Sequence, residues 1–210
     1  MGKVIAAITT SVDGYIVGPD DGPEHGLGIG GERLHYWVMG GPWSYADEAR
    51  DTEGMKGADR EYFESLVEGM GGGIVGRAMY EAAGAWGGKN PFPGTLVVLT
   101  HRTEDQPEES AGFLFVDGFD AALATARHLA GDANVSLGGG ADLIRQGLAA
   151  GVVDELAIST APVVLGGGKR LFEGFDQDVE LEVLGTWSSP YATHVRYAVK
   201  DGGTDRGRVS

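Results

Sequence analysis

No cysteine occurs in the 210-residue sequence, which excludes disulfide bonds, thiolate nucleophiles and cysteine-ligated metal sites. The sequence also lacks the G-x-S-x-G motif of serine hydrolases. The histidines are scattered and none shows the spacing of metal ligands; they are His25, His35, His101, His128 and His194. We therefore expect neither a metal site nor Ser-His-Asp hydrolysis.

Long apolar runs and an excess of basic residues are missing as well. The apolar run near the N-terminus is too short for a signal peptide or a membrane-spanning helix. The 31 acidic residues outnumber the 16 basic ones, and a net charge of -15 repels the phosphate backbone of nucleic acids. We expect a soluble cytoplasmic protein that binds neither membranes nor nucleic acid. A small phosphorylated ligand remains compatible with this charge, because a few placed arginines overcome a diffuse field locally.

Short apolar segments alternate with amphipathic segments along most of the chain, a pattern typical of α/β proteins. The pattern predicts strands at residues 3–10, 73–76, 95–100, 112–117 and 134–137, and two adjacent late strands at 181–189 and 193–200. Residues 153–166 are predicted to form a strand that runs into a bend marked by Pro162. It predicts helices at residues 32–40, 59–70, 77–84, 119–131 and 141–151, with glycines at 71–73 ending the second helix. We therefore expect a central, mostly parallel sheet with antiparallel C-terminal strands.

The segments between these elements are rich in turn-forming residues. They predict loops at residues 11–31 and 41–54, and a loop as long as the first is usually functional or mobile. No linker or internal repeat divides the chain, so we expect one domain over residues 1–200. Residues 201–210 are predicted to form a disordered tail.

Three glycines, Gly138, Gly139 and Gly140, separate a predicted strand from a predicted helix. Unpaired amides and the dipole at a helix start favour an anion, and missing side chains let a phosphate approach. A tight strand-to-helix turn explains the same residues equally well. The stretch matches neither the Rossmann fingerprint nor a P-loop. The glycines alone therefore leave both interpretations open.

Two further strands are followed by basic residues. Arg77 follows the strand at 73–76, and Thr100, His101 and Arg102 follow the strand at 95–100. Ligands of parallel sheets bind beyond the carboxyl ends of the strands. Two arginines and a glycine turn suit a dinucleotide with a 2′-phosphate, although each arginine taken alone is more typical of a solvated surface.

These stretches resemble the dihydrofolate reductase-like family, and within it the group similar to the C-terminal reductase domain of the bifunctional riboflavin-biosynthesis deaminase/reductase. The resemblance covers residues 3 to about 199 and rests on the order and spacing of five stretches. They are ITTSVDGYIVG (8–18), GGIVGRAMYE (72–81), VVLTHR (97–102), VSLGGGADLIRQGLAAGVVDELAIST (135–160) and PVVLGGGKRLFEG (162–174). The resemblance implies a three-layer fold with helices on both faces of the sheet. It also implies a homodimer, for which the late strands and the segment around residues 162–175 are candidates for the contact. It also makes 162–175 a structural turn that leads to a short helix.

The resemblance implies that NADPH binds in an extended pose across the sheet. The residues implied near the adenosine 2′-phosphate are Gly76, Arg77, Thr100, His101 and Arg102. Those implied along the pyrophosphate and the path to the nicotinamide are Leu137, Gly138, Gly139, Gly140, Ala141, Asp142 and Leu143. Those implied around the nicotinamide are Thr9, Ile16 and Gly18, with residues 11–31 as a lid. The glycines would then serve as turn and as phosphate site together.

Several residues are candidates for the substrate side. Asp13 matches an aspartate that the family places near the substrate, although Asp-Gly is also an ordinary turn pair. His35 is a candidate proton donor, because the ordinary pKa of histidine lies near neutrality. Trp37 and Trp43 are candidates for stacking on a flat heterocycle, with core packing the preferred interpretation for Trp37.

The substrate side also departs from the family pattern. Ala7 stands where the riboflavin reductases usually carry a lysine, and neither Glu32 nor Asp59 is assignable to the acidic residue that anchors a pterin. The leading prediction is an NADPH-dependent reductase of a small heterocyclic substrate, resembling 5-amino-6-(5-phosphoribosylamino)uracil reductase of riboflavin biosynthesis. The alternatives are a dihydrofolate or pterin reductase and a non-catalytic NADPH-binding protein.

Overall fold

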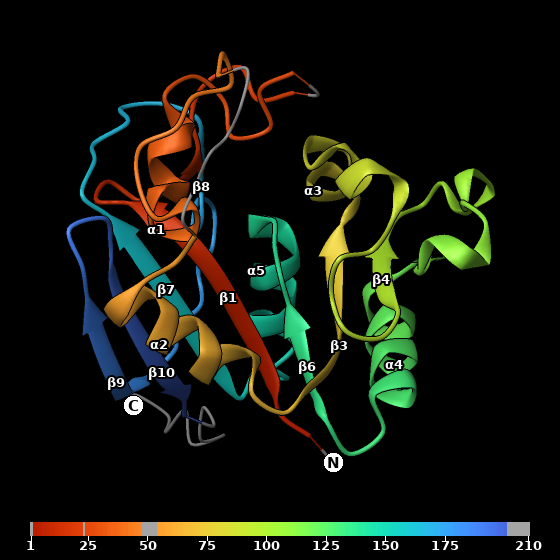
Figure 1. Ribbon diagram of the computed structural model, residues 1–210. Helices are drawn as coiled ribbons and strands as arrows, with labels where there is room; N and C mark the ends of the chain where they lie inside the picture. The colour runs from red at the N-terminus through yellow and green to blue at the C-terminus, as the bar shows by residue number, and fades with distance from the viewer. Residues whose placement is uncertain (1, 23, 48–53, 201–210) are drawn as a thin grey trace.

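The structure is a computed structural model that describes residues 2–22, 24–47 and 54–200. Eight strands form one sheet in the order β5-β4-β3-β6-β1-β7-β10-β9 (Figure 1). They are β1 (Val4–Ser11), β3 (Met70–Gly76), β4 (Leu96–Leu99), β5 (Phe113–Val116), β6 (Asn134–Leu137), β7 (Glu155–Ala161), β9 (Leu181–Ser188) and β10 (Thr193–Val199). All pairings from β5 to β7 are parallel, whereas β10 is antiparallel to both β7 and β9. The predicted mostly parallel sheet with antiparallel C-terminal strands is confirmed.

Helices cover both faces of the sheet, as the three-layer fold requires. One face carries α4 (Phe119–Ala130) and α5 (Ala141–Ala149), and the other carries α1 (Tyr36–Met39), α2 (Gly57–Val67) and α3 (Arg77–Ala82). Strand β1 contributes side chains to the cores on both faces of the sheet, because successive side chains of a strand point to opposite faces. Val4 and Ala6 pack into the α4–α5 core, while Ile5 packs with Trp37 and Tyr62 beneath α1 and α2.

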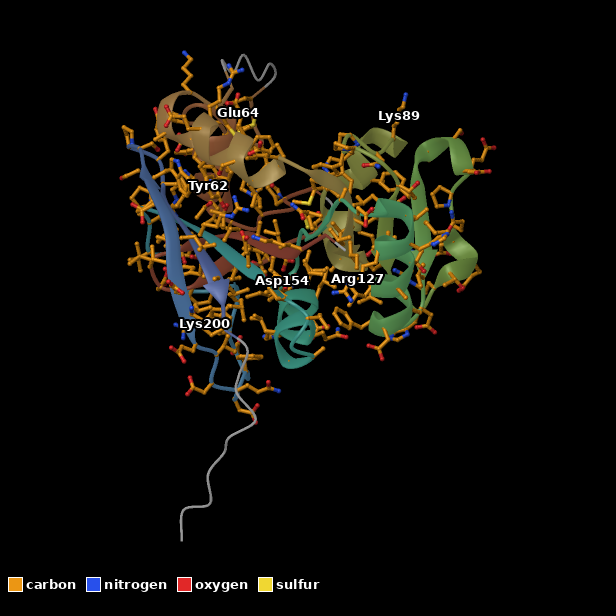
Figure 2. The ribbon with its side chains drawn as sticks, turned by 90° about the horizontal axis from the view of Figure 1, so that it is seen from below. Tyr62, Glu64, Lys89, Arg127, Asp154 and Lys200 are labelled. Atoms are coloured by element: carbon orange, nitrogen blue, oxygen red, sulfur yellow. The ribbon has the colours of Figure 1, made fainter. Side chains whose placement is uncertain are left out.

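Helix spacing explains which side of each helix is buried. On α4 the buried residues Ala122, Leu123 and Ala126 recur at intervals of three and four, so they form one apolar stripe facing the sheet. On α2 the buried Tyr62 points inward and the exposed Glu64 points away (Figure 2). Among the described residues, none of the helices is both long and apolar enough to cross a membrane.

The predicted helix at 59–70 ends early, and the glycines after it belong to a strand. Helix α2 stops at Val67, and β3 begins at Met70 and runs through Gly71 and Gly73. A Cβ atom on Gly71 would lie 2.5 Å from Ala133 Cβ, and one on Gly73 would lie 2.3 Å from Ser136 Oγ. These glycines allow neighbouring segments to approach the strand closely, which periodicity in a single segment does not reveal.

Two other expectations about irregular segments were wrong. The predicted loop at 11–31 contains a short strand, β2 (Tyr15–Val17), which pairs with β8 (Lys169–Arg170). The short helix expected after the turn at 162–175 does not form, because residues 171–174 make a turn after β8. Residues 48–53 of the predicted loop at 41–54 and the predicted tail at 201–210 lie outside the described residues. The homodimer stays a prediction.

Candidate functional site

A cavity of about 1560 Å³ extends along the sheet and reaches the carboxyl ends of the parallel strands. Strands β4, β3, β6 and β1 are neighbours in the sheet, so their ends meet at this edge. Most residues predicted to hold the cofactor line the cavity: Thr9, Ile16, Gly76, Arg77, Thr100, His101, Arg102, Gly138, Gly140, Ala141, Asp142 and Leu143. Gly18, Leu137 and Gly139 do not line it. The binding roles of all these residues stay predictions.

The glycine turn joins β6 to α5 and is fastened to the end of β3. The Gly138 N–H donates to Ile74 O (2.9 Å), and the Gly76 N–H donates to Gly139 O (2.8 Å). Gly139 has a φ of +116°, which L side chains rarely adopt. Helix α5 begins directly after the turn, so its first amides face the cavity edge without partners within the helix. The turn is therefore structurally required and also presents a helix start suited to an anion.

Both arginines of the predicted 2′-phosphate site are paired with carboxylates. Arg77 Nε and Arg102 Nη2 donate to the same oxygen, Glu81 Oε1, at 2.8 and 2.6 Å. Arg77 Nη2 also donates to Asp105 Oδ2 at 2.9 Å. Hydrogen bonds from Arg77 and Arg102 hold the pKa of Glu81 below its ordinary value. Neither acid was predicted from the sequence, although Glu81 lies four residues after Arg77 on α3, a spacing typical of helical ion pairs.

Asp13 lies outside the cavity and fastens the turn at 162–168 to the first loop. It accepts hydrogen bonds from Ser11 Oγ (2.6 Å) and from the amides of Leu165 (3.1 Å) and Gly166 (2.8 Å). These hydrogen bonds, that from Ser11 above all, lower the pKa of Asp13 to about 2. A carboxyl group with this pKa carries no proton at neutral pH, so the geometry gives Asp13 a positioning role and no support as a proton donor.

The aromatic candidates border the other end of the cavity. Trp37 is 7% exposed, and its Nε1 donates to Thr9 Oγ1 at 3.1 Å, so its main role is core packing, the preferred interpretation. Trp43 lines the cavity in edge-to-face contact with Tyr45, with ring centroids 4.9 Å apart. His35 also lines the cavity, and burial lowers its pKa to about 4. His35 is therefore uncharged at neutral pH and holds no imidazolium proton to donate.

A buried row of polar side chains was missed by the sequence analysis. His194 Nδ1 lies 2.7 Å from Ser159 Oγ, and His194 Nε2 lies 2.9 Å from Asp59 Oδ1. All three side chains are almost fully buried, and Tyr62 stacks on His194 with ring centroids 4.1 Å apart. Ser159 is the register partner of both His194 and Thr9, so the row crosses the sheet from α2 to the cavity. Positions 35 and 135 residues apart give no local signal of this contact.

Buried His194 and half-buried His35 predict a loss of stability in mild acid. Burial lowers the pKa of both His194 and His35, so the unfolded chain binds protons below about pH 6.5 that the folded chain refuses. The two uncharged histidines therefore stabilise the folded state above about pH 6.5, and this stabilisation is lost as the pH falls. We expect the free energy of unfolding to drop by roughly 2 kcal/mol from His35 alone between pH 7 and pH 5. Urea titrations at both pH values measure it.

His35→Gln should flatten this dependence, whereas His128→Gln, at an exposed position of α4, should not. Carboxylates with lowered pKa values lose their contribution only below about pH 4, outside this window. An unfolding free energy equal at pH 7 and pH 5 would contradict the prediction.

Comparisons with known proteins agree with this architecture. The family model described as RibD C-terminal domain matches residues 2–195. A curated relative, the uncharacterized protein YwjB of Bacillus subtilis (strain 168), is 29% identical over 125 residues, which cover 59% of this chain and 71% of that protein.

Solved structures share the fold at low sequence identity. A putative riboflavin biosynthesis protein from Shewanella sp. PV-4 matches with a TM-score of 0.67 and 20% identity, covering 94% of this chain and 99% of that one. Dihydrofolate reductase from Enterococcus faecalis, complexed with NADP(H) and RAB-propyl, matches with a TM-score of 0.60 and 19% identity over 95% and 98% of the two chains. A pyrimidine reductase-like protein from Corynebacterium diphtheriae matches with a TM-score of 0.60 and 15% identity over 95% and 92%. The dihydrofolate reductase-like fold is therefore confirmed.

Proposed function

The chain belongs to the RibD C-terminal domain family, and from this premise we propose that it is an NADPH-dependent reductase of a small heterocyclic substrate. The substrate class that the family suggests is an aminopyrimidine resembling 5-amino-6-(5-phosphoribosylamino)uracil. NADPH would supply the hydride, and the protein would hold the nucleotide, orient the two rings and limit water around them.

One observation carries the cofactor part of this proposal. The cavity runs continuously from the aromatic end, past the glycine turn and the start of α5, to the arginine cluster. At that cluster Arg77 Nη1 is buried and has no hydrogen-bond partner among the described residues. A buried guanidinium N–H without an acceptor is costly, and an anionic group of a ligand would satisfy it. The residues present thus fit a phosphorylated nucleotide.

The polar row weighs against the dihydrofolate alternative. A pterin anchor needs a carboxylate that is free to accept hydrogen bonds from the ligand. Asp59 on α2 is 3% exposed, and its Oδ1 is already bonded to His194. Freeing Asp59 would leave a buried imidazole N–H without an acceptor, which costs about 1–3 kcal/mol. An uncharged heterocycle stacked near Trp43 requires no such rearrangement.

Nucleotide titration of wild type and of the Arg77→Ala/Arg102→Ala double variant tests the proposal. We expect wild type to bind NADPH more tightly than NADH. The double variant should prefer NADH instead, because Glu81 and Asp105 would then face the 2′-phosphate without compensating charge. The expected change in the ratio of dissociation constants is about 10- to 100-fold, from charged hydrogen bonds of about 1.5–3 kcal/mol partly offset by the acids.

Arg60→Ala is the matched control, because Arg60 pairs with Glu64 on α2 as Arg77 pairs with Glu81 on α3. It should leave both affinities unchanged. The proposal would be overturned if wild type bound neither NADPH nor NADH. Binding without oxidation of NADPH by any aminopyrimidine or pterin would favour the non-catalytic alternative.

A further inference from the structure

The proposed adenosine end of the nucleotide site contains two cations and two anions. Arg77 and Arg102 point at one carboxylate oxygen of Glu81, and Arg77 also bonds to Asp105. Formal charges in this cluster therefore sum to zero. Two arginines without these acids would strongly favour the doubly charged 2′-phosphate over a neutral hydroxyl.

We propose that Glu81 is the residue that sets the choice between NADPH and NADH, and that the balanced cluster accepts both. This inference rests on the proposed function, since it assumes that the cavity binds a nicotinamide dinucleotide. It goes further by assigning the nucleotide specificity to Glu81, an acid that weakens the attraction of the two arginines for the 2′-phosphate.

The hydrogen-bond groups of the cluster suit either nucleotide. Glu81 Oε1 accepts hydrogen bonds from both arginines, and the second oxygen, Oε2, is left as an acceptor for a ligand. In Rossmann-type dinucleotide sites a carboxylate accepts a hydrogen bond from the ribose 2′-hydroxyl of NADH, whereas an arginine accommodates the 2′-phosphate of NADPH. Arg77 Nη1, buried without a partner among the described residues, is the donor that a phosphate oxygen would satisfy.

Differences in exposure show which contacts can give way. Arg77 is 19% exposed, and its guanidinium carbon lies 5.1 Å from the centre of the Phe115 ring, so it is held in place. Arg102 and Glu81 are 54% and 45% exposed, and ion pairs at such positions are weak. A 2′-phosphate would therefore displace Glu81 from Arg102 while Arg77 kept its bond to Asp105. The displaced carboxylate of Glu81 then repels the phosphate, and this repulsion reduces the difference between the affinities for NADPH and NADH.

Glu81→Gln tests this inference, because glutamine keeps the size of the side chain and removes its charge. Calorimetric titrations at pH 7 should compare NADPH with NADH, and adenosine 2′,5′-bisphosphate with adenosine 5′-monophosphate as probes of the adenosine end alone. We expect wild type to favour the 2′-phosphate by less than about 10-fold. Glu81→Gln should raise this preference by about another 10-fold, chiefly by tightening the binding of the ligands that carry the 2′-phosphate.

Glu104→Gln is the matched control, since Glu104 precedes Asp105 but, among the contacts of the described residues, forms no hydrogen bond or ion pair with either arginine. It should change the preference by less than twofold. Equal effects of the two variants would mean a diffuse charge effect and would overturn the inference, as would an unchanged preference in a Glu81→Gln variant that melts like wild type. Both results leave the reductase proposal standing. If neither wild type nor Glu81→Gln binds any of the four ligands, the proposed function is overturned as well.

Discussion

Gly140→Val should weaken NADPH binding by at least about 100-fold while the chain still folds. Gly140 has φ -82° and ψ -162°, an extended conformation with a negative φ that does not by itself require glycine. A Cβ atom there would meet only Ile16 Cδ1, at 3.9 Å, so the folded protein has room for it. The added methyl groups would occupy the cavity at the start of α5. We expect them to block two or more charged hydrogen bonds from its amides to the pyrophosphate, each about 1.5–3 kcal/mol.

Fluorescence titration with NADPH measures the loss, and a thermal melt reports whether the variant folds. Gly22→Val is the matched control: Gly22 has no atom within 4 Å of its Cβ position and does not line the cavity. Gly140→Ala provides a smaller change should valine prevent folding, and it should still bind more weakly than wild type. Affinities equal to wild type in both Gly140 variants would exclude the glycine turn from the nucleotide site.

The sequence was sufficient to predict the edge of the sheet that the cavity reaches. The strands ending at Gly76, Leu99 and Leu137 are short apolar runs bounded by glycine or polar residues, and this local pattern is what defines a buried strand. Parallel strands place their carboxyl ends at one edge, so Arg77 and Arg102 could be expected near the glycine turn. This part of the prediction needed only periodicity and the geometry of parallel sheets.

The contacts that decide the chemistry depend on packing between distant segments. Whether Asp59 is free or bonded to His194 depends on how α2 lies across β10, and no spacing in the sequence encodes that distance. Similarly, Gly71 and Gly73 resemble a helix stop until Ala133 and Ser136 are placed beside them. The contacts of Glu81 were predictable only in part. The helical spacing from Arg77 indicates one ion pair, but nothing in the sequence indicates that Arg102 binds the same carboxylate.

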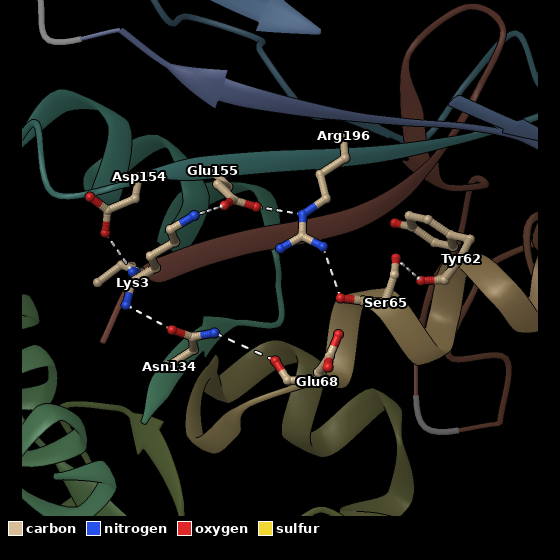
Figure 3. A network of polar contacts seen from close by, with 9 residues as sticks. Lys3, Tyr62, Ser65, Glu68, Asn134, Asp154, Glu155 and Arg196 are labelled. Carbon is tan, nitrogen blue, oxygen red and sulfur yellow. Dashed lines mark hydrogen bonds and ion pairs between the residues drawn. The ribbon is translucent and has the colours of Figure 1, made fainter. Parts of the chain in front are cut away.

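The largest expected loss of stability comes from Glu155 on β7, which lies between two cations (Figure 3). Its side chain is 3% exposed, accepts from Lys3 Nζ at 2.6 Å and also bonds to Arg196 Nε. Arg196 in turn donates to Ser65 O at 2.8 Å, which ties β10 to α2. Glu155→Ala would leave the partly buried guanidinium without its counter-ion. We expect the free energy of unfolding to fall by about 3 kcal/mol, the lower end of the cost of breaking a buried pair.

Urea unfolding of Glu155→Ala, Glu155→Gln and Lys3→Ala separates charge from packing. Lys3→Ala should cost less than about 1 kcal/mol, because the Lys3 side chain is 59% exposed. Burial tends to raise the pKa of Glu155, but hydrogen bonds from Lys3 and Arg196 outweigh it and hold the pKa below its ordinary value. The ionised form therefore stabilises the fold above about pH 4.3, and this contribution disappears as the pH falls below it. The difference in the free energy of unfolding between wild type and Glu155→Gln should shrink over the same pH range. A difference that is small at pH 7, or that is the same at pH 3 as at pH 7, would show that the ion pair adds no net stability.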